Sequence, residues 1–392
     1  MSEWPMVKLG EVARVVAGGT PKTSVWEYWD GDIPWVTPKD LALSESLWIN
    51  AGERFITDYG LAKSAAALLP RGTVLWSSRA PIGLVAIANN QIATNQGFKS
   101  FVPGGELDSE YLAYFLIHQR PILEMMGVGA TFKEVSAKRA AEIMVPLPPL
   151  GEQKRIAEIL GGVSKAIHAV EQQLQLVESA CVNSFERKFN LEMQNGVRDA
   201  SSIADFIAST QYGTSKKAKE DGDIPILRMG NVTYSGKINM TDLKYIDLDE
   251  RELEKFSLKN GDLLFNRTNS AELVGKTAVF ESFSDQIISY AGYLVRARVN
   301  ADSNPYYVSG YLNSPSGKAQ LRLRAKAIVG MANINAREFL SLEIPAATKE
   351  EQEEFAHLFE KCEKIRHLLH RKLSLLQELQ KSLTTRAFAG LL

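Results

Sequence analysis

Two short polar segments follow predicted strands, and each contains one arginine. Ser77-Ser78-Arg79 comes directly after the apolar run 73–76, and Asn266-Arg267 comes directly after the run 263–265. Arginine, asparagine and serine on loops are side chains with which proteins hydrogen-bond to base edges in a DNA groove. The same residue types are also common in solvated turns. Both contact with nucleic acid and simple turn formation therefore remain open for these segments.

Two further loops combine basic and polar side chains, and they lie at matching places in the two halves of the chain. Each precedes one copy of the sequence Asp-Gly-Asp-Ile-Pro, at residues 30–34 and 221–225. Basic side chains on such loops typically bind phosphates and set the position of a protein on DNA. The predicted DNA-binding residues are Lys22, Trp26, Ser77, Ser78, Arg79, Gln96, Thr214, Lys216, Lys217, Asn266, Arg267 and Asn269.

The chain repeats itself over its length. Three features return after the same interval of 199 positions: Val145-Pro146 as Ile344-Pro345, Glu152-Gln153 as Glu351-Gln352, and Phe189 as Phe388. The segment that ends in Arg267 parallels the one that ends in Arg79 if one residue is missing from the second copy. We therefore expect the two arginines at equivalent positions in two similar domains.

A long helix is predicted after each domain. Apolar residues there recur at steps of three and four, the period of a coiled-coil seam. Thr348 and Glu351 have the spacing of a capping box at the start of the second helix. Each seam alone would be exposed to water, so we expect the helices to pack together, and the order of the domains requires them to be antiparallel. The predicted seam residues are Ile156, Leu160, Val163, Ile167, Val170, Leu174 and Val177, with Phe355, Phe359, Leu369, Leu373 and Leu376.

These patterns predict a mixed α/β fold with an internal pseudo-two-fold repeat, in which an antiparallel coiled coil of two long helices separates two globular domains. The predicted order is a domain over residues 1–148, a helix over 149–194, a second domain over 195–346 and a helix over 347–392. Short apolar runs such as 83–88, bounded by glycine and proline, predict strands. Residues 110–126 predict a helix that is broken or kinked at Pro121.

Composition excludes several classes of protein. The formal net charge of -1 and the pI near 6.6 argue against binding nucleic acid by bulk positive charge, so any contact must use local patches. The two cysteines cannot form a disulfide framework, which fits a reducing cytoplasm. No run of about 18 apolar residues predicts a membrane span, and no apolar signal segment is seen near the N-terminus.

No catalytic or metal-binding residue is predicted. An adenine methyltransferase needs an Asn/Asp-Pro-Pro-Tyr/Phe loop, and the nearest sequence, Asn304-Pro305-Tyr306-Tyr307, lacks the second proline and predicts a turn. There is no Gly-x-x-x-x-Gly-Lys-Ser/Thr loop for the phosphates of ATP. The five histidines lie in predicted helices, and none has zinc-ligand spacing with a cysteine.

The ordered set of motifs, present twice, resembles the specificity subunit of a type I restriction-modification system. The resemblance rests on the Pro-Leu-Pro-Pro-Leu-Gly-Glu-Gln junction at 146–153, on Gly-Gly-Thr-Pro at 18–21 and on Arg-Ala-Phe-Ala-Gly at 386–390. It covers essentially the whole chain. The second junction departs from the pattern, because it reads Ile344-Pro345-Ala346-Ala347 and lacks the double proline.

The resemblance implies a non-catalytic, cytoplasmic subunit whose two domains each read one half of a bipartite double-stranded DNA target. The helices would set the gap and dock two methyltransferase subunits, and motor-nuclease subunits could join. S-adenosylmethionine, ATP and magnesium would belong to those partners. Two alternatives remain open: a specificity subunit for a methyltransferase in another phage-defence system, and a coiled-coil adaptor that binds protein rather than DNA.

Overall fold

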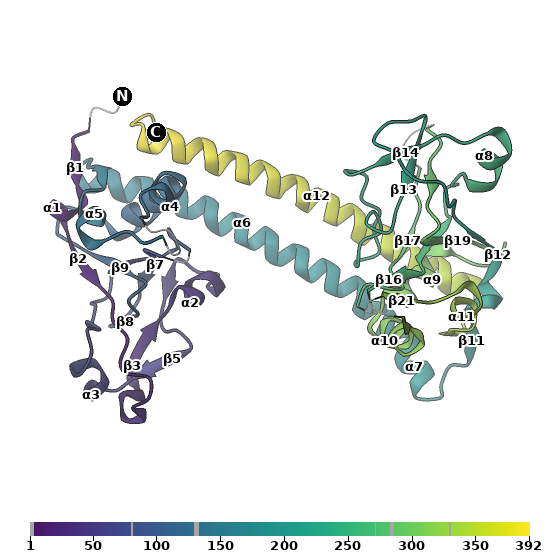
Figure 1. Cartoon of the computed structure of the whole chain (residues 1–392), viewed down its shortest axis with the longest axis horizontal. Helices are drawn as coiled ribbons and strands as arrows, with labels where there is room; N and C mark the ends of the chain where they lie inside the picture. The colour runs from purple at the N-terminus through teal and green to yellow at the C-terminus, as the bar shows by residue number, and fades with distance from the viewer. Residues whose placement is uncertain (1–3, 80, 129–132, 271, 283–285, 329–330) are drawn as a thin grey trace. The chain divides into compact units, whose positions relative to one another are not determined.

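The computed structural model describes residues 4–79, 81–128, 133–270, 272–282, 286–328 and 331–392. The chain forms two compact units. Unit 1 comprises Met1–Gln172 with Arg371–Leu392, and unit 2 comprises Gln173–His370. Each unit holds one globular domain together with a stretch of both long helices (Figure 1). We name the globular parts domain 1 (residues 4–148) and domain 2 (residues 195–346).

Domain 1 is built on small, mostly antiparallel sheets. The largest has the order β2-β9-β6-β7-β4, the second β5-β3-β8, and β1 pairs with β10. The predicted strand at 83–88 is confirmed as β7. The bounds are β1 Met6–Lys8, β2 Ala13–Ala17, β3 Trp29–Val36, β4 Trp48–Ile49, β5 Arg54–Ile56, β6 Val74–Trp76, β7 Val85–Ala88, β8 Ala93–Thr94, β9 Lys99–Pro103 and β10 Met144–Pro146.

One long helix and several short ones complete domain 1. The helix predicted at 110–126 is present as α4 and is not broken, since it continues through Pro121. Leu116 and Leu123, on either side of the proline, are buried, so packing holds the helix where one backbone hydrogen bond is missing. The bounds are α1 Leu9–Val12, η1 Trp26–Tyr28, α2 Pro38–Leu43, α3 Asp58–Ala62, α4 Ser109–Met125 and α5 Ala137–Ala141.

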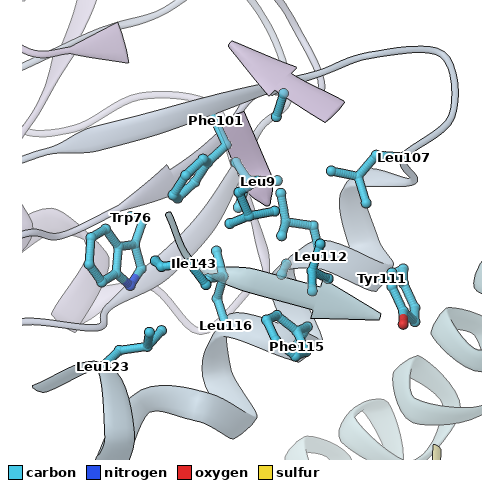
Figure 2. Packing of buried hydrophobic residues seen from close by; sticks show 14 of the residues in the cluster. Leu9, Trp76, Phe101, Leu107, Tyr111, Leu112, Phe115, Leu116, Leu123 and Ile143 are labelled. Atoms are coloured by element: carbon cyan, nitrogen blue, oxygen red, sulfur yellow. The ribbon is translucent and has the colours of Figure 1, made fainter. Parts of the chain in front are cut away.

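The core of domain 1 lies between α4 and the five-stranded sheet. Trp76 and Phe101 come from neighbouring strands, with ring centroids 6.1 Å apart, and Leu112 and Leu116 of α4 belong to the same buried cluster (Figure 2). Full burial of one such side chain contributes about 1.5–3 kcal/mol. This core fixes the strand that leads into the polar segment after residue 76.

Domain 2 repeats this plan. Its sheets have the orders β12-β19-β15-β17, β14-β13-β18, β16-β21-β20 and β11-β22. The strands are β11 Ala200–Ser202, β12 Ile207–Tyr212, β13 Ile224–Leu227, β14 Lys244–Ile246, β15 Leu263–Asn266, β16 Thr268–Asn269, β17 Thr277–Val279, β18 Ser289–Tyr290, β19 Leu294–Val299, β20 Lys326–Ile328, β21 Met331–Asn333 and β22 Glu343–Pro345. The helices are η3 Ile203–Phe206, α8 Glu250–Phe256, α9 Pro305–Asn313, α10 Pro315–Arg324 and α11 Ala336–Leu340.

The repeated glutamine after each domain has a structural role. The side chain of Gln153 is buried and accepts a 2.8 Å hydrogen bond from the backbone N–H of Asp108, just before α4. Gln352 is also buried and accepts a 2.9 Å bond from the N–H of Asn304, just before α9. The predicted turn at 304–307 is therefore wrong: Asn304 is the N-cap of α9, since its side chain accepts from the N–H of Tyr306.

Both long helices are confirmed. The first is α6, Leu150–Phe185, which continues through a π-helical turn, η2 Glu186–Asn190, into α7 Leu191–Gln194; the second is α12, Lys349–Phe388. The predicted capping box is present: the Thr348 hydroxyl accepts from the N–H of Glu351, whose carboxylate accepts from the N–H of Thr348. This exchange satisfies backbone donors that a helix end leaves unpaired.

The two helices are antiparallel in each unit. In unit 1, Arg155 of α6 donates to the carbonyl of Leu392 at 2.8 Å, and Gln380 of α12 donates to Ser164 at 2.9 Å. In unit 2, the rings of Phe185 and Phe355 lie 5.0 Å apart. Among the predicted seam residues, Ile156, Leu160, Val170, Leu174 and Phe355 are buried, and Val163, Ile167, Val177, Phe359, Leu369, Leu373 and Leu376 are half-buried.

The C-terminal end of each long helix packs among aromatic side chains of a domain. This domain is domain 1 for α12 and domain 2 for α6. Phe388, in the last turn of α12, lies 5.5 Å from the ring of Tyr111 in domain 1. Phe189, just beyond the end of α6, lies 5.0 Å from the ring of Tyr307 in domain 2. The repeat of 199 positions between these phenylalanines therefore reflects an equivalent packing role.

Candidate nucleic-acid interface

Backbone hydrogen bonds show which residues of the two domains correspond. The N–H of Ser77, after β6, donates to the carbonyl of Leu84, and the Ser77 carbonyl accepts from a glycine N–H. The N–H of Asn266, at the end of β15, donates to the carbonyl of Lys276, and its carbonyl also accepts from a glycine N–H. Ser77 and Asn266 are therefore equivalent.

The same register corrects the expected pairing of the two arginines. No residue is missing from the second copy, so Arg267 corresponds to Ser78, and Arg79 corresponds to Thr268. Two further bonds agree, because the carbonyls of Ser78 and Arg267 both accept a backbone N–H from the segment before the next short helix. Successive residues of an extended segment point to opposite sides. The side chains of Arg79 and Arg267 therefore point to opposite sides of two equivalent backbone segments.

In domain 1, Arg79 belongs to a small charge cluster. Its guanidinium lies 3.9 Å from one carboxylate oxygen of Glu134, and Lys99 lies 3.0 Å from the other oxygen. Lys99 is almost buried, whereas about a third of the Arg79 side chain is exposed. Two cations thus share one carboxylate, which leaves a local excess of positive charge in a chain that is nearly neutral.

Two loops adjoin this cluster. Gly97 lies beside the stem of Arg79, since a Cβ at that glycine would be in ordinary contact with Arg79 Cγ, at 3.7 Å. The neighbouring Gln96 is exposed and accepts a hydrogen bond from the hydroxyl of Thr20. The N–H of Gly19, next to Thr20, donates to the backbone at Thr94 at 2.8 Å. Arg79, Gln96 and the Gly-Gly-Thr loop are thus brought together.

Lys22 and Trp26 lie farther along the same loop. Both are exposed, and Trp26 has 79% of its surface accessible. The carbonyl of Lys22 accepts a 3.4 Å bond from the indole N–H of Trp29, which ties the loop to β3. No contact joins these two side chains to Arg79 among the residues that the structure describes.

In domain 2, Arg267 stacks on an aromatic ring. Its guanidinium carbon lies 4.8 Å from the ring centroid of Tyr212 at the end of β12, and the tyrosine is 40% exposed. Lys217 is exposed, while Lys216 is engaged by the carboxylate of Glu252. Asn269 is half-buried, and its side chain caps the following N–H.

Four predicted contact residues are buried, which revises the expectation for them. Ser77, Ser78, Thr214 and Asn266 are less than 5% exposed. The Ser77 hydroxyl donates to the carbonyl of Pro81, and the Thr214 hydroxyl accepts from a nearby backbone N–H, so both side chains stabilise turns. Their burial leaves none of these four side chains accessible for direct contact with a ligand.

Sequence reasoning missed three residues that shape this surface: Lys99, Glu134 and Tyr212. A lone lysine in an apolar strand was a usable signal for Lys99. Glu134 had none, because it meets Arg79 only through a pairing of distant segments. Among the described residues, no cluster of three histidine, cysteine or carboxylate side chains could hold a metal ion. Within the same residues, no helix is both long and apolar enough to cross a membrane.

Comparison with known proteins agrees with this architecture. Residues 1–179 match the family described as the type I restriction modification DNA specificity domain. The chain is 38% identical over 190 residues to the specificity subunit of the type I restriction enzyme MjaIX of Methanocaldococcus jannaschii, an alignment that covers 48% of this chain and 44% of that protein. Residues 1–179, a little under half of the chain, are therefore similar to this DNA specificity domain.

A second relative extends the match. The specificity subunit of the type I restriction enzyme EcoKI of Escherichia coli is 27% identical over 303 residues, or 72% of this chain and 65% of that protein. The two alignments therefore span about half to two thirds of these relatives. The fold is shared with the type I S subunit of M. genitalium, with a TM-score of 0.62 at 13% identity, covering 99% of this chain and 96% of that one.

Proposed function

We propose that this chain is the DNA-recognition subunit of a type I restriction-modification enzyme and that each domain reads one half of a bipartite target. One observation carries the proposal. The two domains hold equivalent backbone frames, but equivalent positions carry different side chains: Arg79 corresponds to Thr268, and Ser78 to Arg267. A shared frame with different side chains is what two different half-sites require.

The charge of the chain supports a division of labour on the DNA. Affinity for DNA derives largely from phosphate contacts, and a chain of net charge -1 supplies few of them. Partner subunits would then provide the remaining phosphate contacts, while this chain reads bases through local clusters such as that at Arg79. Two methyltransferase subunits are the expected partners, with motor-nuclease subunits joining them.

The long helices would set the gap between the half-sites and dock these partners. α12 bears exposed apolar residues away from its seam: Leu358, Ile365 and Leu368 in unit 2, and Leu375 and Leu379 in unit 1. An apolar stripe that remains in water is typical of a protein-binding surface. Methyl transfer, cleavage, S-adenosylmethionine, ATP and magnesium are assigned to the partners, and the complex to the cytoplasm.

Methylome sequencing tests the proposal directly. The full chain, expressed with the methyltransferase encoded beside it, should produce a split motif with adenine methylation in both halves. A chimera in which residues 1–148 come from a relative should change one half-site and leave the other. Methylation of a continuous motif, or a change in both halves, would contradict the proposal. The neighbouring genes distinguish a restriction system from another phage-defence system.

A further inference from the structure

Three basic residues lie close together in domain 2: Lys318 and Arg322 contact Tyr234, and Lys276 lies near Lys318. Lys276 lies just before β17, and Lys318 and Arg322 lie on α10. Lys276 and Lys318 are only 6% and 7% exposed, whereas lysine is almost never buried unless it is paired. No ion pair joins any of the three to a carboxylate among the residues that the structure describes. The cluster therefore carries uncompensated positive charge.

Lys318 is the least satisfied member of this cluster. Its ammonium nitrogen is buried and has no hydrogen-bond partner within the described residues, and it lies 4.5 Å from the ring centroid of Tyr234. Burial, together with the charges of Arg322 and Lys276, lowers the pKa of Lys318 to about 8. The Lys276 ammonium group, in contrast, has a hydrogen-bond partner, since it donates a 2.7 Å bond to the carbonyl of Met229.

Tyr234 and Arg322 form the exposed part of the cluster. The tyrosine is 44% exposed, and its hydroxyl accepts a 3.0 Å bond from the Arg322 guanidinium, so its own proton is free to donate outward. The ring is held by a tight turn, in which the N–H of Gly236 donates to the carbonyl of Thr233. Gly236 has φ +79°, which favours glycine.

The spacing on α10 is itself unfavourable without a ligand. Lys318 and Arg322 are four residues apart, so they lie on the same face of the helix, and like charges at this spacing destabilise it. An anion bound between the helix and the turn would remove this repulsion. Its charge would be felt strongly by the two buried ammonium groups, because water screens them little.

We propose that Arg322 and Tyr234 bind a phosphate group of the DNA backbone, with Lys318 and Lys276 stabilising its charge from beneath. The assignment rests on the proposed function. A guanidinium can bind phosphate oxygens in a bidentate manner, and the phenol adds a third donor. Among the described residues of domain 1, Leu84 stands at the position that corresponds to Lys276, so this lysine has no equivalent there. Domain 2 would therefore hold the DNA by an additional, sequence-independent contact.

The test is fluorescence anisotropy of the full chain, purified together with the methyltransferase encoded beside it, with a labelled duplex that carries the methylated motif, and with an unrelated duplex of equal length, over a series of salt concentrations. Arg322→Ala should weaken binding to both duplexes about tenfold. It should also reduce the slope of log affinity against log salt by about one. Lys318→Met should weaken both in the same direction and raise the melting temperature, since it removes an unpaired buried charge. Lys259→Met removes an exposed lysine of domain 2 and serves as the matched control.

Three outcomes distinguish a failure of the proposed function from a failure of the phosphate site. If the wild-type chain binds neither duplex, the proposed function itself fails. If the wild-type chain binds but Arg322→Ala and Lys318→Met match Lys259→Met in affinity and slope, the phosphate site is overturned while the function stands. If calorimetry shows that inorganic phosphate binds the wild-type chain but not Arg322→Ala, and DNA affinity is unaffected, the site serves a free phosphoryl ligand and the backbone assignment is wrong.

Discussion

The hydroxyl of Tyr111 donates a 2.8 Å hydrogen bond to the carbonyl oxygen of Pro146, the last residue of β10. Tyr307 makes the same bond, also 2.8 Å long, to Pro345 at the end of β22. Both tyrosines are fully buried, and burial raises the pKa of each phenol above its usual range, so both remain neutral donors. Each bond fastens the strand that leads into a long helix to the helix that covers the sheet.

Removing either hydroxyl should destabilise its own domain. Tyr111→Phe leaves the Pro146 carbonyl without its donor, and a buried unsatisfied acceptor costs about 1–3 kcal/mol. Tyr307→Phe should have a similar effect through Pro345. Urea unfolding of the full chain measures both. Tyr59→Phe, at a side chain that is 54% exposed, is the control and should change little. Equal stability of Tyr111→Phe and the control would show that the bond contributes nothing.

Arg79→Ala should relax recognition at one position in one half-site. A base contact by arginine contributes about 1–3 kcal/mol, and its loss affects only the base that it reads. Arg267→Ala should do the same in the other half-site. Methylome sequencing of each variant gives the result, and Lys138→Ala, at an exposed position on α5, is the control. Unchanged motifs and unchanged DNA affinity in both arginine variants would remove these residues from the interface.

The stability of unit 1 should fall as the pH drops below about 6.5. Burial lowers the pKa of His118, whose ring stacks on Phe388 with centroids 5.5 Å apart. In the unfolded chain, the His118 imidazole has its ordinary pKa near 6.5 and takes up a proton below that pH. In the folded chain the same imidazole stays neutral to a lower pH, so protonation favours the unfolded chain. The contribution is complete above pH 6.5 and declines as the pH falls toward the folded pKa. His118→Gln should flatten this dependence between pH 7.5 and 5.5 in unfolding experiments; an identical pH profile would refute it.

Two leucines on α6 provide a matched test of the helix seam. Leu160 is 1% exposed, whereas Leu176 is 68% exposed. Leu160→Ala should cost about 2–5 kcal/mol, because it leaves a cavity in a packed core. The same substitution at the exposed Leu176 should change the free energy of unfolding by about 0.5 kcal/mol or less. Thermal unfolding compares the two, and equal losses would mean that the seam does not stabilise the chain.

Local rules predicted the repeated frame well, since strands, helix starts and the heptad seam depend on neighbouring residues. The capping box of Thr348 and Glu351 was readable for that reason. The sequence did not reveal that Arg79 corresponds to Thr268 and not to Arg267. This correspondence is defined by backbone hydrogen bonds between strands, which cannot be inferred by counting residues between motifs. The buried serines also looked like loop residues, as local sequence does not reveal which turns are covered by other segments.

Distant pairings account for the rest of the candidate interface. Glu134 meets Arg79 and Lys99 only after strands from separate parts of domain 1 have aligned. The phosphate site proposed in domain 2 combines a turn, the start of a strand and a helix. Each of its residues is ordinary in its own segment, and only their burial together makes them unusual.

The return of α12 to domain 1 has a consequence for biosynthesis. Ala387 is fully buried in the same core as Trp76 and Leu112, and Phe388 packs against it. A ribosome must therefore translate all of domain 2 before domain 1 receives the last pieces of its interior. A chain that stops early would present an unfinished first domain, with apolar surface open to proteases and chaperones. The arrangement would thus favour the removal of incomplete chains.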